Sequence, residues 1–282
     1  MTLPTMAAVD IGTNSMRLLI VRQIGDETVE LGRWERVTGL GTGVDQGGTF
    51  SEEAMDRTLL ALAEFGGRMN KAEVRRRRAV ATSAARDAAN RDQFFDRAEI
   101  ALGVRPELIS GEAEAQLAFA GASAGRAGPL LVIDIGGGST EFVTASGGTS
   151  YDIGSVRLTD RLLNERPAGS TQVTEARRMV VESFAEVTSF AGIVLGVAGT
   201  WTSLAAMEGV DVLTLATVSA WVARLSGMSF EETASVPGLD PARARVILAG
   251  AIVAEGAMIA TSAGSVEVSR RDLLDGIVTQ LL

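Results

Sequence analysis

The chain repeats one short pattern, and this repeat limits the folds it can adopt more than any other feature. Residues Ala8–Ser15 form an apolar run, an aspartate and a turn of small polar residues, and Val132–Ser139 repeat that pattern. Each copy is followed by a second run of strand-forming residues, Met16–Val21 and Glu141–Thr144, so each predicts a β-hairpin. Internal self-similarity of this kind indicates a duplicated architecture. The sequence therefore predicts two lobes with one hairpin each.

The segments around the hairpins alternate between strand-like and helix-like patterns, which is typical of an α/β fold. Ser51 is a suitable N-cap for an amphipathic helix, and Asn90 with Gln93 resembles a capping box at the start of another. Asp240–Pro241 predicts the start of a helix that continues through Ala260. At 282 residues the chain is also long enough for two hydrophobic cores.

The chain contains neither cysteine nor histidine, and this absence excludes several kinds of chemistry. Disulfides, thiolate nucleophiles, Cys/His zinc sites and Ser-His-Asp arrangements are all impossible without these residues. Catalysis would have to use carboxylates, Arg or Lys, hydroxyls, backbone amides or a hard metal ion.

Charge and hydropathy argue against nucleic-acid and membrane partners. The net charge of −9 is the wrong sign for a broad nucleic-acid-binding face. The longest apolar stretch, Val246–Ala260, contains Glu255 and is too short to cross a bilayer. The first ten residues show no basic segment followed by an apolar one, so we expect a cytoplasmic protein.

A carboxylate at the end of an apolar strand, followed by a glycine-rich turn, can present backbone N–H groups to an anion and hold a hydrated cation nearby. Asp10 precedes the turn Gly12–Ser15, and Asp134 precedes the turn Gly136–Thr140. A single turn of this kind could be an ordinary hairpin. Two related copies favour a phosphate-binding function.

Five segments in order, VDIGTNSMRLL, ATSAARDAAN, SGEAEAQLAFAG, VIDIGGGSTEFV and GVAGTWTSLAA, resemble the exopolyphosphatase / guanosine pentaphosphate phosphohydrolase (Ppx/GppA) family in its short two-domain form. The resemblance spans nearly the whole chain. It implies a two-lobed actin-like ATPase fold, a duplicated ribonuclease H-like α/β fold with an interdomain cleft that holds the substrate phosphates. We expect a first lobe of residues 1–118 plus 266–282, with the last helix folding back on it, and a second lobe of residues 119–265.

The same resemblance implies roles for individual residues. Glu114 would orient or deprotonate the attacking water, and Glu141 would help to place the water or the metal. Asp134 and Asp10 would hold Mg²⁺. The substrate phosphates would be bound by Gly12, Thr13, Asn14, Ser15, Arg17, Arg86, Gly136, Gly137, Gly138, Ser139 and Thr140.

Several of these residues also have simpler interpretations. Without the resemblance, Glu114 would be an ordinary exposed helix carboxylate, Glu112 would be as good a candidate, and Arg86 could be a surface arginine. The third glycine motif, Gly196–Thr200, either lines the cleft, accepts a guanosine or is purely structural. The basic run Arg75–Arg78 is either a solvated edge or a landing site for polyphosphate.

The chain departs from the family pattern at two places. Several relatives carry histidine in the second lobe, where this chain has Leu215–Arg224, and some carry arginine where this chain has Leu274. Both departures concern contacts with a long substrate more than the hydrolytic core.

The expected function is Mg²⁺-dependent hydrolysis of the terminal phosphate of inorganic polyphosphate. The alternatives are hydrolysis of guanosine pentaphosphate, an actin-like ATP-binding module or sugar kinase, and a polyphosphate-binding regulator without catalysis. The family resemblance also implies a homodimer.

Overall fold

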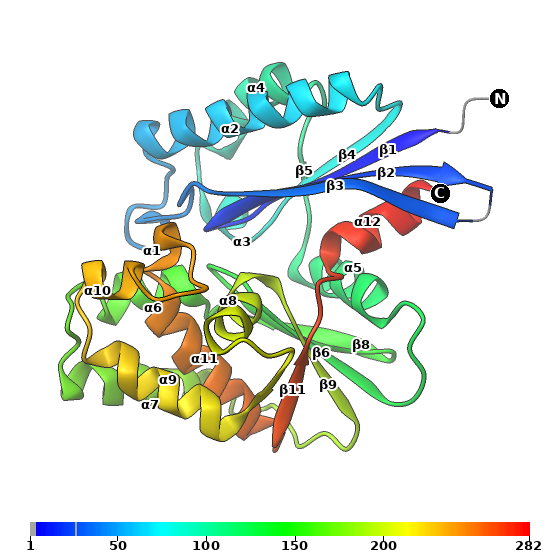
Figure 1. Cartoon of the computed structure of the whole chain (residues 1–282). Helices are drawn as coiled ribbons and strands as arrows, with labels where there is room; N and C mark the ends of the chain where they lie inside the picture. The colour runs from blue at the N-terminus through cyan, green and yellow to red at the C-terminus, as the bar shows by residue number, and fades with distance from the viewer. Residues whose placement is uncertain (1–3, 26) are drawn as a thin grey trace. The chain divides into compact units, whose positions relative to one another are not determined.

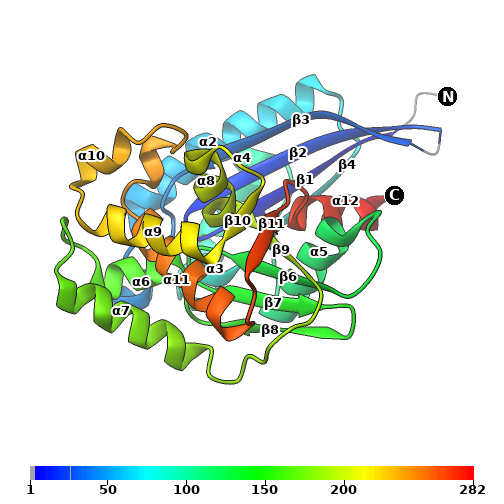
Figure 2. The same ribbon diagram turned by 60° about the horizontal axis from the view of Figure 1, so that its bottom comes forward.

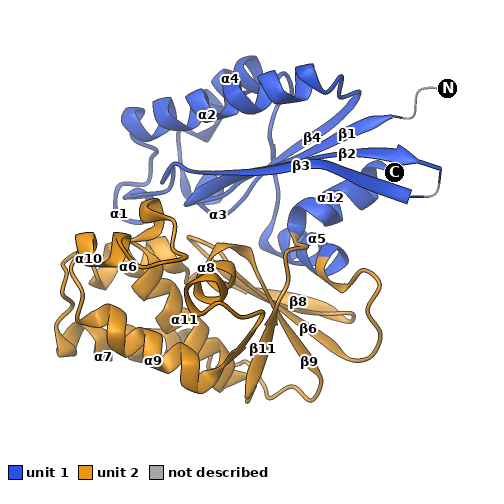
Figure 3. Ribbon diagram, in the orientation of Figure 1, with its two compact units in different colours: residues 1–121, 273–282 blue, residues 122–272 orange. Residues whose placement is uncertain are grey.

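The computed structural model describes residues 4–25 and 27–282, which divide into two units. Unit 1 contains residues 1–121 and 273–282, and unit 2 contains residues 122–272 (Figure 3). The last helix therefore belongs to unit 1. The boundaries between the units fall at 121/122 and 272/273, whereas the boundaries expected from the sequence are 118/119 and 265/266.

Unit 1 is built on a five-stranded sheet in the order β3-β2-β1-β4-β5. β1 pairs with β2 and β2 with β3 in antiparallel directions, whereas β1–β4 and β4–β5 are parallel. Figure 1 shows α2 and α4 on one face of this sheet and α12 on the other. The strands are β1 Thr5–Ile11, β2 Ser15–Ile24, β3 Glu27–Val37, β4 Arg76–Ala81 and β5 Glu107–Leu108. The helices are α1 Val44–Gly47, α2 Glu52–Lys71, α3 Ser83–Asp87, α4 Arg91–Leu102, α5 Gly111–Ser123 and α12 Leu273–Leu281.

Unit 2 repeats this topology in a six-stranded sheet of order β10-β11-β9-β6-β7-β8. β6, β7, β8, β9 and β11 have the same neighbours and directions as β1, β2, β3, β4 and β5, and β10 is an added antiparallel edge strand. Helix α11 packs against α6, α7, α8 and α9 (Figure 2). The strands are β6 Leu130–Ile135, β7 Thr140–Thr144, β8 Gly147–Tyr151, β9 Ile193–Val197, β10 Val212–Thr214 and β11 Ser265–Val268. The helices are α6 Ser155–Leu162, α7 Ser170–Ser183, α8 Ala198–Glu208, α9 Leu215–Ser226, α10 Phe230–Ala234, the 3₁₀ helix Pro241–Arg243 and α11 Ile247–Ala260.

The shared strand order confirms the duplication and the actin-like α/β fold class predicted from the sequence. Each unit has its own hydrophobic core, with Phe65 and Phe94 fully buried in unit 1 and Trp201 and Leu248 fully buried in unit 2. No helix in the described part of the chain is long and apolar enough to cross a membrane.

Two helix starts differ in their cap chemistry. Ser51 caps α2 as predicted, since its Oγ accepts a hydrogen bond of 3.2 Å from the Ala54 N–H. Asn90 precedes α4 but its side chain makes no cap bond, so the predicted capping box with Gln93 is wrong. The Asn90 amide instead bonds to both backbone groups of Phe50, at 2.9 and 3.0 Å. A long-range contact therefore replaces the local one.

The helix predicted to run from Asp240 to Ala260 is also wrong in its first turns. Asp240 does cap a helical turn, with its Oδ1 3.0 Å from the Ala242 N–H. That turn is a 3₁₀ helix, since the N–H groups of Arg243, Ala244 and Val246 bond to carbonyls three residues earlier. The α-helix begins only at Ile247.

Candidate functional site

The first glycine-rich loop joins β1 to β2. Its carbonyl groups accept hydrogen bonds that hold the loop in place. The Gly12 N–H donates to the Ser15 carbonyl at 3.0 Å, which closes the hairpin. The Thr13 carbonyl accepts from Gly41, and the Asn14 carbonyl accepts from Thr38 and Gly39, at 2.8 to 3.0 Å. Within residues 4–25 and 27–282, neither the Thr13 nor the Asn14 N–H donates to another residue. These two donors remain for an anion.

The second loop joins β6 to β7 and repeats this geometry. The Gly136 N–H donates to the Ser139 carbonyl at 3.0 Å, as in the first hairpin. The carbonyls of Gly136 and Gly137 accept hydrogen bonds from backbone N–H groups at the start of α6, at 2.7 to 3.0 Å. The N–H groups of Gly137 and Gly138 make no hydrogen bond to any residue that the structure describes. In both loops, carbonyl groups accept hydrogen bonds from neighbouring residues, and two N–H groups are used by no described residue.

In the first hairpin the predicted metal ligand Asp10 is paired with the predicted phosphate contact Arg17. The two residues lie directly opposite each other on β1 and β2. Arg17 donates from Nε and Nη2 to Asp10 Oδ2, at 3.0 and 2.6 Å. Asp10 is buried and Arg17 is half-buried. The arginine therefore supplies a positive charge beside Asp10, at the base of the loop.

In the second hairpin the corresponding positions hold two carboxylates. Asp134 and Glu141 lie directly opposite each other on β6 and β7, and both are buried. The Ser150 hydroxyl donates to Glu141 Oε1 at 2.7 Å. The second hairpin therefore carries two acidic side chains where the first carries an acidic and a basic one.

No group of three or more Asp or Glu residues in the described part of the chain is arranged to hold a metal by itself. Mg²⁺ does not require such a group, because it keeps several waters and combines one or two carboxylates with substrate phosphate oxygens. Asp134 and Glu141 place two carboxylates at facing positions, and Asp10 Oδ2 accepts a hydrogen bond from Arg17.

Glu114 and Arg86, which the sequence placed in separate roles, form an ion pair. Glu114 lies in the first turn of α5, which Ser110 caps by accepting from the Ala113 N–H at 3.2 Å. Arg86 lies on α3, directly after β4, and its Nη1 donates to Glu114 Oε2 at 2.9 Å and to the Ile109 carbonyl at 3.2 Å. The Glu114 side chain is 11% exposed, whereas Glu112 is exposed.

Burial raises the pKa of Glu114 above its usual range. The positive charge and hydrogen bond of Arg86 lower it, the charge of Asp10 raises it, and Arg17 lowers it, with the net change upward. Two charged residues on β1 and β2, the strands that flank the first loop, therefore act electrostatically on Glu114. A carboxylate with a raised pKa is a stronger base than an exposed one, which suits proton abstraction from water.

Two residues behind the second loop were not identified from the sequence. Gly154, the N-cap of α6, packs so closely that a Cβ there would lie 2.6 Å from the Gly137 backbone and 2.7 Å from the Ser139 nitrogen. Arg157, on the first turn of α6, donates from Nε to the Gly138 carbonyl at 2.8 Å. Neither residue belongs to a recognisable motif, although a glycine before a helix is a weak signal of close packing.

Two predicted phosphate-binding hydroxyls already have partners within their own unit. Thr140 is fully buried and its hydroxyl donates to the Ile153 carbonyl at 2.6 Å. Thr13 is buried and its Oγ1 accepts from the Ala84 N–H at 3.2 Å. Each threonine therefore fixes the loop of its own unit in place, and Ser139, next to Thr140 in the chain, is also buried.

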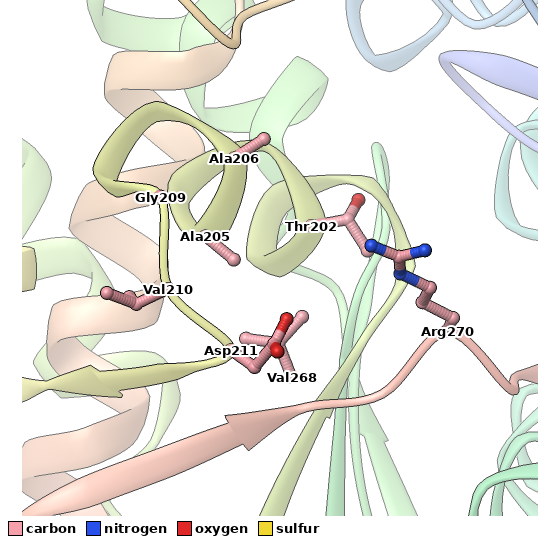
Figure 4. A pocket seen from close by; sticks show the side chains of 8 residues that line it. All are labelled: Thr202, Ala205, Ala206, Gly209, Val210, Asp211, Val268 and Arg270. Carbon is pink, nitrogen blue, oxygen red and sulfur yellow. The ribbon is translucent and has the colours of Figure 1, made fainter.

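The third glycine motif forms the β9–α8 turn and has a tightly packed interior. A Cβ on Gly199 would lie 2.0 Å from the Arg243 guanidinium, and Ala198 has a positive φ of 66°. A hollow of about 290 Å³ lies beside the following helix (Figure 4). Small and apolar side chains of α8 and β11 line it, with Asp211 and Arg270 as its charged groups.

The basic run at the start of β4 is bound to its own unit. Arg76 donates to the Leu281 carbonyl at 2.6 Å, and Arg77 donates to Asn70 Oδ1 at 2.7 Å. Arg78 pairs with Glu107 at 3.0 Å and also donates to Gln280. These contacts favour the structural interpretation of the run.

Comparison with known proteins assigns the chain to a family. The model of the Ppx/GppA phosphatase family matches residues 19–282. Exopolyphosphatase 2 of Mycobacterium tuberculosis is 38% identical over 324 aligned residues, which cover 100% of this chain and 99% of that protein.

Solved structures agree with this assignment. The crystal structure of an exopolyphosphatase-like protein has a TM-score of 0.92 at 35% identity, covering 100% of this chain and 98% of that one. The Aquifex aeolicus member of the Ppx/GppA family has a TM-score of 0.81 at 28% identity, covering 99% and 97%. The chain described here belongs to the Ppx/GppA phosphatase family.

Proposed function

We propose that this chain is an exopolyphosphatase, which releases the terminal orthophosphate of inorganic polyphosphate by attack of water. Family membership supports a phosphoanhydride hydrolase, and a full-length relative at 38% identity is named an exopolyphosphatase. The observation that carries the proposal is the ion pair between Glu114, buried at the start of α5, and the half-buried Arg86 on α3.

Glu114 is proposed as the general base. A carboxylate oxygen takes a proton from the attacking water as the new P–O bond forms and the bond to the bridging oxygen breaks. Such a base contributes about 10²–10⁴ in rate. Arg86 orients Glu114 through Nη1, and a planar guanidinium has further donors that suit a terminal phosphate.

The two loops are proposed to bind phosphate through backbone N–H groups. Thr13 and Asn14 in the first loop, and Gly137 and Gly138 in the second, present donors that no described residue uses. Preorganised N–H groups stabilise the charge that develops on phosphate oxygens without reorganisation during the reaction. Arg17 adds a positive charge next to the first loop.

Mg²⁺ is proposed as the cofactor, held by Asp134 with help from Glu141. Bound there, the ion would neutralise charge on the transferred phosphate and the leaving oxygen. Asp10 would instead keep Arg17 oriented through its ion pair.

The test compares orthophosphate release from long-chain polyphosphate by the wild type, Glu114→Gln and the matched control Glu112→Gln. Glu112 is exposed on the same helical turn, so its substitution changes the same charge outside the buried pair. We expect Glu114→Gln to lose about 10²-fold or more in kcat and Glu112→Gln to keep wild-type activity. Equal losses in both variants, or none in either, would remove Glu114 from the mechanism.

Metal dependence is tested in the same assay with Asp134→Asn and with a chelator. We expect chelation to abolish release, and Asp134→Asn to need more Mg²⁺ for half-maximal activity. Full activity in chelator would refute the metal proposal while leaving the role of Glu114 intact.

The assay also includes guanosine pentaphosphate and ATP as substrates. The name of the full-length relative favours polyphosphate over guanosine pentaphosphate. Turnover of ATP with no release from polyphosphate would overturn the proposed function. A cytoplasmic homodimer remains our expectation from the family resemblance, and analytical ultracentrifugation of the purified protein tests the dimer.

A further inference from the structure

A second hollow lies in unit 2, at the side of the sheet formed by β7 and β8. Its volume is about 190 Å³, and the segment after α7 closes one side of it. Aromatic rings of Phe142, Tyr151 and Phe190 line it together with threonine and serine hydroxyls. This size is below that of pockets for drug-sized ligands, which begin at about 300 Å³. The hollow suits a small ligand.

The aromatic side chains are held in a fixed arrangement. Phe142 on β7 and Tyr151 on β8 lie on the same side of the sheet, with ring centroids 5.7 Å apart and ring planes at 85°. Phe184 packs behind both, with its centroid 4.9 Å from Phe142 and 5.5 Å from Tyr151. Three mutually tilted rings support one another edge to face, so the aromatic wall is preformed.

Glu186 is the only charged residue among those that line the hollow. It is exposed, and no ion pair or hydrogen bond joins it to another residue that the structure describes. Burial raises the pKa of Tyr151, and the charge of Glu186 raises it further, so the carboxylate lies close enough to act on the phenol. A negative charge therefore lies close to the phenol of Tyr151 in the aromatic wall.

We propose that this hollow binds a small organic ammonium ion, with the cation on the aromatic faces and opposite the Glu186 carboxylate. Aromatic rings attract ammonium groups through their quadrupole, and aromatic cages recognise quaternary ammonium ligands in this way. The hydroxyls of Thr149 and Thr188 add polar contacts for the rest of the ligand.

Other ligand classes fit less well. An anion would be repelled by the Glu186 carboxylate. A metal ion would find a single carboxylate, whereas hard divalent cations take several oxygen ligands. A neutral carbohydrate could use the hydroxyls and a ring, but it would gain nothing from the charge of Glu186. Binding that depends on the charge of the ligand would therefore distinguish a cation site from a carbohydrate site.

The test uses choline and spermidine as probes, and 3,3-dimethylbutan-1-ol as a neutral molecule with the shape of choline. Tyr151 is the only tyrosine in the chain, so ¹³C-tyrosine labelling gives a single NMR reporter inside the hollow. We expect at least one cation to shift this signal with a saturable, millimolar affinity, and the neutral analogue to bind about tenfold more weakly or not at all.

The matched variants are Glu186→Gln and Glu165→Gln, which remove the same charge inside and outside the hollow. Glu186→Gln should weaken cation binding about tenfold, worth about 1.4 kcal/mol, while Glu165→Gln should leave it unchanged. Both variants carry an exposed substitution and should fold normally. Equal binding of choline and its neutral analogue, no binding of either cation, or equal effects of the two variants would overturn the proposal.

Discussion

Gly154 packs directly against the second glycine-rich loop, and this contact can be tested by adding one methyl group. In Gly154→Ala the new Cβ would lie 2.6 Å from the carbonyl carbon and oxygen of Gly137 and 2.7 Å from the Ser139 nitrogen. Gly154 itself has an extended backbone with φ −154°, which alanine adopts readily. The only effect of the substitution is therefore steric.

The size of the effect follows from these distances. Ordinary contact begins at 3.4 Å, so the loop backbone would have to retreat by about 0.8 Å. The obstructing atoms belong to the backbone and not to a flexible side chain. Displacing a substrate-binding group by about 1 Å can cost about 10²-fold in rate, and overpacking destabilises by about 1–3 kcal/mol. We expect kcat/KM for polyphosphate to fall about 10²-fold.

Gly264→Ala is the matched control, because a Cβ at Gly264 in the same unit would meet no atom within 4 Å. Phosphate release and thermal unfolding are measured for both variants. The control should behave like the wild type. If Gly154→Ala kept its activity within about twofold and its melting temperature, the loop would not need this packing. Lost stability with unchanged activity would make the contact structural only.

Further predictions concern single side chains. Because burial raises the pKa of Glu114, stability from this group is complete below the ordinary carboxyl value of 4.5 and is lost as the pH rises through the folded pKa. Glu114→Gln should therefore melt at a higher temperature than the wild type at pH 8, with no advantage below pH 4.5; an advantage that persists there would refute this reasoning. Asn90→Ala should lower the free energy of unfolding by about 1–3 kcal/mol, since two bonds to Phe50 are lost, whereas Gln93→Ala should have no effect; similar denaturant midpoints for both would argue for the local cap. Arg78→Gln should leave the KM for polyphosphate within about twofold at low salt, because Arg78 pairs with Glu107, and a large salt-dependent rise would restore the landing-site interpretation.

Local patterns in the sequence predicted those parts of the fold that depend on neighbouring residues. The aspartate and small residues of each loop predicted both hairpins, and Ser51 predicted the start of α2. The capping box at Asn90 failed because Phe50, distant in the chain, offers that side chain two hydrogen bonds. The 3₁₀ turn after Asp240 shares the cap and proline of an α-helix, so these residues cannot distinguish the two.

The candidate site shows the same limit. The sequence located Glu114 and Arg86 but could not show that they form an ion pair, because β4, α3 and α5 must fold first. Nor could it show that the Thr140 hydroxyl donates to the Ile153 carbonyl, because β7 must first pair with β8. The sequence did not predict Arg157 and Gly154, because their contacts with the second loop arise from the packing of α6. Residue type indicates what a side chain can do, and packing decides what it contacts.

The two hairpins also show how the copies of a duplicated unit can differ in charge. The position opposite the aspartate is Arg17 in the first copy and Glu141 in the second. The first strand pair therefore balances its buried charge with an arginine, which cannot leave the protein. The second strand pair has two carboxylates at facing positions, and these are the side chains proposed to hold Mg²⁺. If both hairpins bind phosphate, the dependence on Mg²⁺ should arise from the second, and the first should tolerate the absence of metal.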